Sequence, residues 1–170
     1  MLEALRERGH VNILLRFIAE GSGNRWKLQN EAIIQTEYGS TDVLSLKEVD
    51  KPVVPDNGVL VKVYAASVNA GDWHLMRGTP SLIHFMFGGI LKPKIKILGF
   101  DVAGRVEAIG KDVKQFKPGD EVFGDLSECG FSAFAEYVCA TEAALVLKPV
   151  VTTFEAAATV PTAIRHLEQK

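Results

Sequence analysis

The sequence predicts a mainly β domain, a barrel or a sandwich, with short helices near its two ends. Over 59–66 every second residue belongs to one strongly apolar set, Val59, Val61, Val63 and Ala65. This alternation at period two predicts a strand with one buried face. Turns that contain glycine or proline separate this segment from several other short segments of strand-like composition. This spacing favours a barrel or a sandwich over βαβ units.

The first thirty residues are expected to form an extension to this domain. Apolar residues at 11, 14, 15 and 18 follow the spacing of one helical face, which predicts a short amphipathic helix. The turn-forming segment 21–24 breaks the pattern, and we interpret it as a linker.

Strands are expected at 59–66, 101–109, 121–123 and 134–140. The first of them directly follows the turn signal Asp56–Gly58. Gly104 lies inside the second, where we expect a bulge, a bend or a close backbone approach. Pro118 and Gly119 suit the central positions of a type II turn, which joins the second strand to the third.

The end of the chain returns to a helical pattern. Thr152 and Glu155 have the spacing of a capping box, and the three alanines 156–158 are strong helix formers. Pro161 is expected to interrupt this helix.

Composition and charge exclude several function classes. Hydrophobic residues make up 47% and charged residues 24% of the 170 positions, which is typical of one or two folded domains. The net charge is −2 without a basic face, so we expect no nucleic acid partner. The apolar stretch 11–19 is interrupted and too short to span a bilayer, so we expect neither a membrane partner nor a secretory signal.

The two cysteines and the histidines show no close pairs. Cys129 and Cys139 stand ten positions apart, so we expect free thiols in a reduced, cytoplasmic setting. Zinc sites usually contain pairs such as CxxC or HxxxH, so we expect no metal site. The sequence also contains no GxSxG segment, and no glycine trio lies between a strand and a helix, so we expect no Rossmann domain in this chain.

One polar constellation, Ser67–His74, stands out where the first strand ends. A strand-ending turn, in which Asn69 and Asp72 bind their own backbone, explains it without any catalytic role. The following segment 82–87 is apolar and aromatic enough to line a pocket, and it could equally belong to the core.

A series of motifs runs in one order through most of residues 32–163. It comprises Ala32–Gln35, Gly39, Asp42–Leu44, Pro52, Val59–Val63, Ala66–Asn69, Asp72, Gly99–Gly104, Phe116–Val122, Phe134–Tyr137 and Ala156–Pro161. In this series the sequence resembles the medium-chain dehydrogenase/reductase superfamily, in particular its zinc-independent quinone oxidoreductase-like and enoyl reductase-like branch. The resemblance implies an N-terminal GroES-like catalytic domain over 31–163, a partly open β-barrel with short flanking helices.

The resemblance also implies that both zinc sites of zinc-dependent relatives are absent. Those relatives have a cysteine ligand at the position of Asn69, and a histidine and an acidic residue at the positions of Phe100 and Asp101. Their structural zinc lobe holds four cysteines, whereas the corresponding segment here holds only Cys129.

Zinc-independent members of the superfamily typically reduce the C=C bond of enones, quinones or enoyl thioesters. The resemblance therefore implies an NADP or NAD cofactor and a catalytic, cofactor-binding role for Asn69, near the nicotinamide and the substrate oxygen. Thr162 is assigned to cofactor binding, and Asp72 to structural support. The predicted substrate pocket comprises His74, Phe85 and Phe87.

The resemblance further implies that a nucleotide-binding domain should follow Pro161–Ala163, but residues 164–170 do not resemble the usual continuation. We therefore expect a truncated or isolated catalytic domain that is inactive alone, with NADP bound tightly only in the complete enzyme. An alternative is a non-catalytic GroES-like module that acts as a homodimer or with a chain carrying the nucleotide-binding domain. A co-chaperonin-like oligomer is a third hypothesis.

Overall fold

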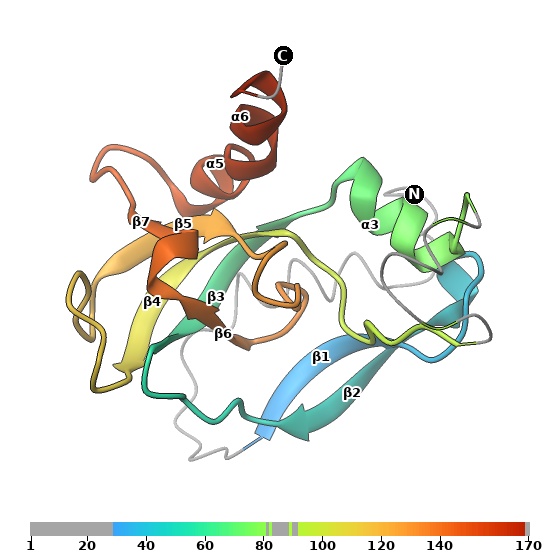
Figure 1. Cartoon of the computed structure of the whole chain (residues 1–170), viewed down its shortest axis with the longest axis horizontal. Helices are drawn as coiled ribbons and strands as arrows, with labels where there is room; N and C mark the ends of the chain where they lie inside the picture. Colours follow the sequence, from blue (N-terminus) through green and yellow to red (C-terminus); the bar gives the residue numbers. More distant parts are fainter. Residues whose placement is uncertain (1–28, 81, 83–88, 90–91, 169–170) are drawn as a thin grey trace.

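The computed structural model describes residues 29–80, 82, 89 and 92–168 (Figure 1). The helix expected within residues 1–30 lies outside the described residues, as do Phe85 and Phe87. None of the helices in the described part of the chain has the length and apolar character needed to cross a bilayer.

Two antiparallel sheets make up most of the fold. The strands are β1 (Gln29–Gln35), β2 (Leu44–Asp50), β3 (Gly58–Ser67), β4 (Asp101–Ile109), β5 (Glu121–Asp125), β6 (Tyr137–Thr141) and β7 (Leu145–Leu147). β1 pairs with β2, and the larger sheet has the order β6-β3-β4-β5-β7. Within the described residues this sheet ends at β6 and β7 and stays open, so the predicted mainly β, partly open architecture is confirmed.

The helices are short and flank the sheets. They are α3 (Ala70–Arg77), α5 (Phe154–Ala158) and α6 (Pro161–Glu168), with 3-10 turns η1 (Thr41–Val43) and η2 (Glu142–Ala144). α3 directly follows β3, whereas α5 packs on β3 and β4 (Figure 1).

The central pair β3 and β4 carries the main core. Val59, Val61 and Val63 point to the buried side, as the alternation predicts, and Leu60 at the strand's start is buried as well. Gly104 pairs with Val63, and a Cβ atom there would lie 2.1 Å from the carbonyl oxygen of Lys62. The predicted close backbone approach at Gly104 is therefore confirmed.

Two smaller clusters hold the flanking elements. One joins β1 and α3 through side chains that include Ile33, Leu75 and Met76. The other seats α5 on the opposite face of the sheet, where Ala157 and Ala158 pack against Ala65 and Ala103. Only small side chains leave room for this close helix-to-sheet contact, so the alanine run serves packing as well as helix formation.

The turn chemistry is mostly as predicted. Gly119 has a φ of +96°, as the expected type II turn requires. The helix cap differs by one residue, because Thr153 and not Thr152 accepts the N–H of Ala156. Thr152 belongs instead to the preceding turn, where its carbonyl oxygen accepts a hydrogen bond from Lys148 Nζ.

Pro161 begins a second helix, α6, rather than only interrupting the first. Proline suits the first helical position, because that position's N–H has no partner within the helix. The strands β1, β2 and β7 were not predicted from the sequence as separate elements.

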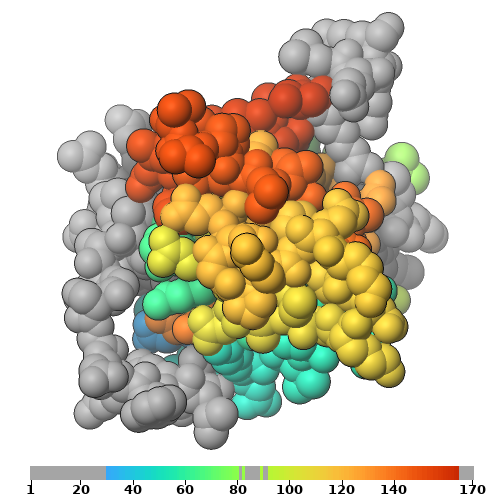
Figure 2. Space-filling model, turned by 90° about the vertical axis from the view of Figure 1, so that its left-hand side faces the viewer, coloured from blue at the N-terminus to red at the C-terminus, as the bar shows by residue number. Residues whose placement is uncertain are grey.

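The open edge at β7 is rich in exposed apolar side chains. Val146 and Leu147 on this strand are more than half exposed, and Val150 and Val151 in the following turn are 97% and 96% exposed. Figure 2 shows this region in orange-red, above the yellow β4–β5 connection.

Candidate active site

Asp101, the first residue of β4, lies at the centre of a polar cluster at one end of the large sheet. Its side chain is fully buried. Its Oδ2 accepts hydrogen bonds from Ser67 Oγ at 3.0 Å and from Asn69 Nδ2 at 3.1 Å. Its Oδ1 accepts from the Thr162 backbone N–H at 3.1 Å and from Thr162 Oγ1 at 2.7 Å. One carboxylate thus joins the end of β3, the start of α3 and the start of α6.

Backbone pairing positions the first of these partners. Ser67 is the last residue of β3 and pairs with Asp101 in the antiparallel register. The chain then turns through Asn69, the N-cap of α3, whose extended backbone points its amide back towards the same carboxylate. Asn69 Nδ2 also donates to Ser67 Oγ at 3.1 Å, which closes a small ring of hydrogen bonds.

Asp72 connects this turn to the loop before β4. Its Oδ2 accepts the backbone N–H of Asn69 at 2.8 Å, and its Oδ1 accepts that of Gly99 at 2.8 Å. Asp72 thus binds backbone groups, as expected for a strand-ending turn, whereas the amide nitrogen of Asn69 donates to the side chains of Ser67 and Asp101 instead. These contacts also suit the structural role predicted for Asp72.

The two aspartates share an unusual electrostatic environment. Burial raises the pKa of Asp72 to about 7, and the two backbone hydrogen bonds offset only part of this effect. Burial also raises the pKa of Asp101, against the opposing hydrogen bonds from Thr162, Asn69 and Ser67. The negative charge of Asp101 also raises the pKa of Asp72.

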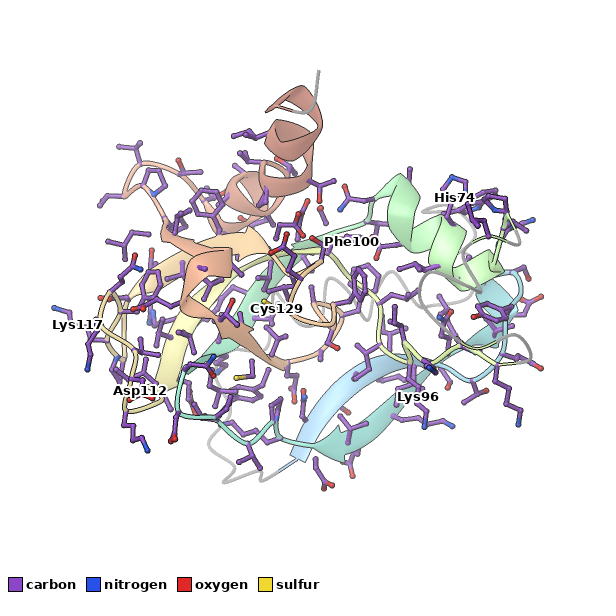
Figure 3. The ribbon with its side chains drawn as sticks, viewed as in Figure 1. His74, Lys96, Phe100, Asp112, Lys117 and Cys129 are labelled. Carbon is purple, nitrogen blue, oxygen red and sulfur yellow. The ribbon has the colours of Figure 1, made fainter. Side chains whose placement is uncertain are left out.

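Phe100 forms an apolar wall next to the polar cluster (Figure 3). Its ring packs edge-to-face on Phe131, with centroids 4.7 Å apart. A Cβ atom at Gly71 would lie 2.8 Å from this ring, so the first turn of α3 touches it directly. A bulky aromatic side chain therefore fills the position that corresponds to the histidine ligand of zinc-dependent relatives.

His74 lies apart from the cluster, on the exposed side of α3 (Figure 3). Its Nδ1 is 2.7 Å from the carbonyl oxygen of Thr79, and its ring packs edge-on against Trp73. Its role in a substrate pocket stays a prediction, as do the roles of Phe85 and Phe87 outside the described residues.

The described residues contain no group of three or more histidine, cysteine, aspartate or glutamate side chains that could hold a metal ion. Both cysteines are free, and Cys129 Sγ lies 3.4 Å from Thr141 Oγ1. Burial raises the pKa of the Cys139 thiol, which disfavours its reactive thiolate form.

Asn69 and Thr162 were predicted from the sequence as site residues, but the carboxylate that links them was not. Asp101 was noted only because it occupies a position that holds a zinc ligand in zinc-dependent relatives, and Ser67 was assigned no role. An aspartate at the start of a predicted strand is by itself only a weak sign of a functional site. Its hydrogen-bond partners depend on how three separate segments of the chain pack together.

The family model of the alcohol dehydrogenase GroES-like domain matches residues 55–150. This chain belongs to that family. The match confirms the predicted membership of the medium-chain dehydrogenase/reductase superfamily. It lies within the predicted domain 31–163, whose boundaries stay a prediction.

Several relatives of this GroES-like domain are oxidoreductases. The chain is 38% identical to 2-methylene-furan-3-one reductase of Solanum lycopersicum, over 76% of this chain and 33% of that protein. It is 34% identical to the chloroplastic NADPH-dependent alkenal/one oxidoreductase of Arabidopsis thaliana, over 82% of this chain and 36% of that protein. The chain thus spans about a third of the length of these curated relatives.

A solved structure shows the same fold. The quinone oxidoreductase of Coxiella burnetii matches with a TM-score of 0.72 and 31% sequence identity, over 83% of this chain and 45% of that one.

Proposed function

We propose that this GroES-like domain is the catalytic domain of a zinc-independent, NADPH-dependent reductase of conjugated carbonyl compounds, either enones or quinones. The observation that carries the proposal is the Asp101 carboxylate, which binds both Asn69 and Thr162. These are the two residues assigned to cofactor binding from the sequence. The names of the tomato, Arabidopsis and Coxiella relatives support the substrate class and the cofactor.

The polar cluster fits the nicotinamide end of such a cofactor. Asn69 is half-buried and presents a neutral amide, and Thr162 lies at the start of α6 with its hydroxyl anchored. Asn69 and Thr162 would hold the nicotinamide and its ribose by hydrogen bonds, and Phe100 would supply an apolar side to the site. When bound, NADPH supplies the two electrons and one proton that reduce the conjugated C=C bond, and a second proton comes from solvent.

The zinc-independent part of the proposal rests on donor chemistry. A carboxamide and a phenyl ring replace the thiolate and imidazole that zinc prefers, and Asp101 already accepts four hydrogen bonds within the protein. Enones and quinones suit such a site, because their negative charge spreads over a conjugated system as they are reduced.

The chain spans about a third of the length of its curated relatives, and this bears on how tightly the chain alone would bind NADPH. We propose that most of the cofactor's contacts belong to a nucleotide-binding domain outside these residues, on the same polypeptide or on another. The chain alone should then bind NADPH weakly, since the glycine-rich phosphate cradle supplies much of the affinity. Titration followed by NADPH fluorescence checks this, and a dissociation constant in the micromolar range or below would contradict it.

A fusion protein tests the proposed activity. Residues 1–163 of this chain are joined to the nucleotide-binding half of the Coxiella quinone oxidoreductase, and NADPH oxidation is measured with a quinone and with an enone. The matched control is the same fusion with Asn69→Leu, which keeps similar volume but removes the amide. We expect turnover in the first and a loss of at least about tenfold in the second. A folded fusion that oxidises NADPH with neither substrate would overturn the proposal.

An interaction module is a second candidate function. The exposed apolar residues at and after β7, Val146, Leu147, Val150 and Val151, favour it, because such a surface beside an open sheet edge can bind another chain. Light scattering after size-exclusion chromatography distinguishes the two cases. A dimer that Val150→Ser with Val151→Ser converts to a monomer would support the module, and a monomer at all concentrations would count against a homodimer.

A further inference from the structure

The helix α6 has little packing to hold it in place. It rises from the body of the domain, and its main packing contact is with β5 (Figure 1). Of its described side chains, Ala163 and Ile164 are exposed, the latter to 49%. A helix of eight residues is unstable by itself in water, since most helical stability in proteins comes from the burial of an apolar face. The described side chains of α6 therefore contribute little of the stability that it needs.

Asp101 caps α6 from a distant part of the chain. The helix begins with Pro161, which has no N–H, and the next N–H, that of Thr162, has no acceptor within the helix. This N–H donates to Asp101 Oδ1 at 3.1 Å, and the Thr162 hydroxyl donates to the same oxygen at 2.7 Å. A negative charge at this end of a helix also interacts favourably with the helix dipole. The cap of α6 is thus a buried carboxylate 61 positions earlier in the sequence.

The neighbouring helix α5 is held in a different way. Its cap is local, because the Thr153 hydroxyl accepts the N–H of Ala156 at 3.2 Å. Ala157 and Ala158 are buried against the large sheet. α5 therefore has both a cap from its own segment and a packed face, whereas α6 depends on the carboxylate at the start of β4.

We propose that α6 is a conditional helix, which forms only while the Asp101 carboxylate holds Thr162. The other carboxylate oxygen accepts a hydrogen bond from Ser67 Oγ at 3.0 Å. Donors that share one carboxylate compete for its charge, so the turn after β3 influences α6 through Asp101. The two states are the formed helix and the unwound segment, a transition between order and disorder. The inference goes beyond the proposed function, because neither cofactor nor substrate takes part in it.

Carbon chemical shifts of residues 163–168 in the full chain at pH 8 measure the ratio of helical to unwound α6. Asp101→Leu keeps a similar volume but removes the acceptor, and we expect this ratio to fall at least about fivefold, the usual effect of losing a helix cap. Asp72→Leu is the matched control, because it removes a buried carboxylate that binds Asn69 and Gly99 rather than α6. It should leave the ratio within about twofold of wild type.

Unchanged signals of β1 and β2 show that each variant is folded. Unwound shifts over 163–168 in the wild-type chain would overturn the inference. An equal fall in the ratio in the folded Asp101 and Asp72 variants would also overturn it. The measurement contains no NADPH, so its failure is distinguishable from a failure of the proposed activity.

A milder pair of variants leaves the carboxylate in place. Thr162→Val removes the hydroxyl that donates to Asp101, and the ratio should fall at least about threefold. Thr162→Ser keeps a hydroxyl and should stay within about twofold of wild type. Valine and serine have similar helix propensities, so propensity does not explain a difference between the two chains. Equal ratios in these variants would contradict the role of the hydroxyl contact.

Ser67→Ala tests the influence of the turn after β3. The Thr162→Val chain is the background, because its lower ratio leaves room for an increase. Removing the Ser67 hydroxyl leaves more of the Asp101 charge for the Thr162 N–H, and the ratio should rise at least about twofold at pH 8, which favours the charged carboxylate. An unchanged ratio would overturn the coupling. A rise that persists in Asp101→Leu would contradict Asp101 as its route.

Discussion

The hydroxyl oxygen of Thr162 lies 2.7 Å from Oδ1 of Asp101, and this contact ties the start of α6 to the start of β4. The backbone N–H of Thr162 reaches the same oxygen at 3.1 Å. The backbone N–H groups in the first turn of a helix have no acceptor within the helix, and here the buried carboxylate accepts one of them. The same contact holds the first turn of α6 against the end of the large sheet.

Removing the Thr162 hydroxyl should destabilise the protein. Thr162→Val keeps the shape of the side chain but deprives a buried carboxylate of one donor, and we expect a loss of about 2 kcal/mol in the free energy of unfolding. Urea denaturation measures it. Thr159→Val is the control, because that exposed hydroxyl donates only to the carbonyl oxygen of Ala156, and its loss should cost clearly less. Equal losses would contradict a special role for the Asp101 contact.

Asp72 should make stability depend on pH. Its pKa rises from 3.8 in the unfolded chain to about 7 in the folded one, so the folded state holds the proton more tightly. The stabilisation by this proton is complete below about pH 4 and is lost as the pH rises through about 7. It amounts to about 4 kcal/mol at most, from the difference between the two pKa values.

Urea denaturation between pH 4.5 and 8 measures this dependence. Asp72→Asn should flatten it, leaving a smaller slope of the same sign from Asp101, whose pKa is also raised. Glu155→Gln removes an exposed carboxylate and controls for the loss of one negative charge. The expectation is wrong if Asp72→Asn and wild type show the same slope.

The loop that carries Phe131 stores backbone strain. Gly130, Phe131 and Ser132 have φ angles of +89°, +68° and +84°, in a region that favours glycine. Ser132→Gly should therefore stabilise the fold by about 1 kcal/mol, and Gly130→Ala should destabilise it by a similar amount. Thermal unfolding compares the three proteins, and a lower melting temperature for Ser132→Gly would contradict the strain.

Gly104 and Gly119 should respond differently to the same substitution. A methyl group at Gly104 meets the Lys62 carbonyl oxygen at 2.1 Å and must push β3 and β4 apart, which we expect to cost about 3 kcal/mol. At Gly119 nothing lies within 4 Å, so Gly119→Ala pays only for its positive φ, about 1 kcal/mol. Comparable losses in urea denaturation would show that crowding at Gly104 is relieved in some other way.

Metal analysis of the dialysed full chain should find no stoichiometric zinc. Neither Asn69 nor Phe100 can replace a thiolate or an imidazole as a ligand. Emission spectrometry measures the content, with and without prior incubation in zinc. One zinc per chain that survives a chelator would contradict the zinc-independent part of the proposal.

The sequence by itself determined the features that depend on neighbouring residues. Alternation at period two located β3, and the Pro118-Gly119 pair specified a turn with positive φ. A series of motifs in one order identified the superfamily. The helix cap was predicted wrongly, because the capping-box spacing to Glu155 favours Thr152, whereas the turn at 149–152 that binds Lys148 leaves Thr153 to accept the N–H of Ala156.

Only the tertiary structure decided that Asp101 binds Ser67, Asn69 and Thr162 together. Two irregularities in the β3–β4 ladder, at Leu60/Val61 and at Val63/Ala65, shift the register and then restore it, so that Ser67 faces Asp101. Alternation cannot reveal such compensating bulges, because each one changes the pairing by a single residue. Thr162 reaches the carboxylate because α5 packs on the same two strands, a contact between segments far apart in the chain.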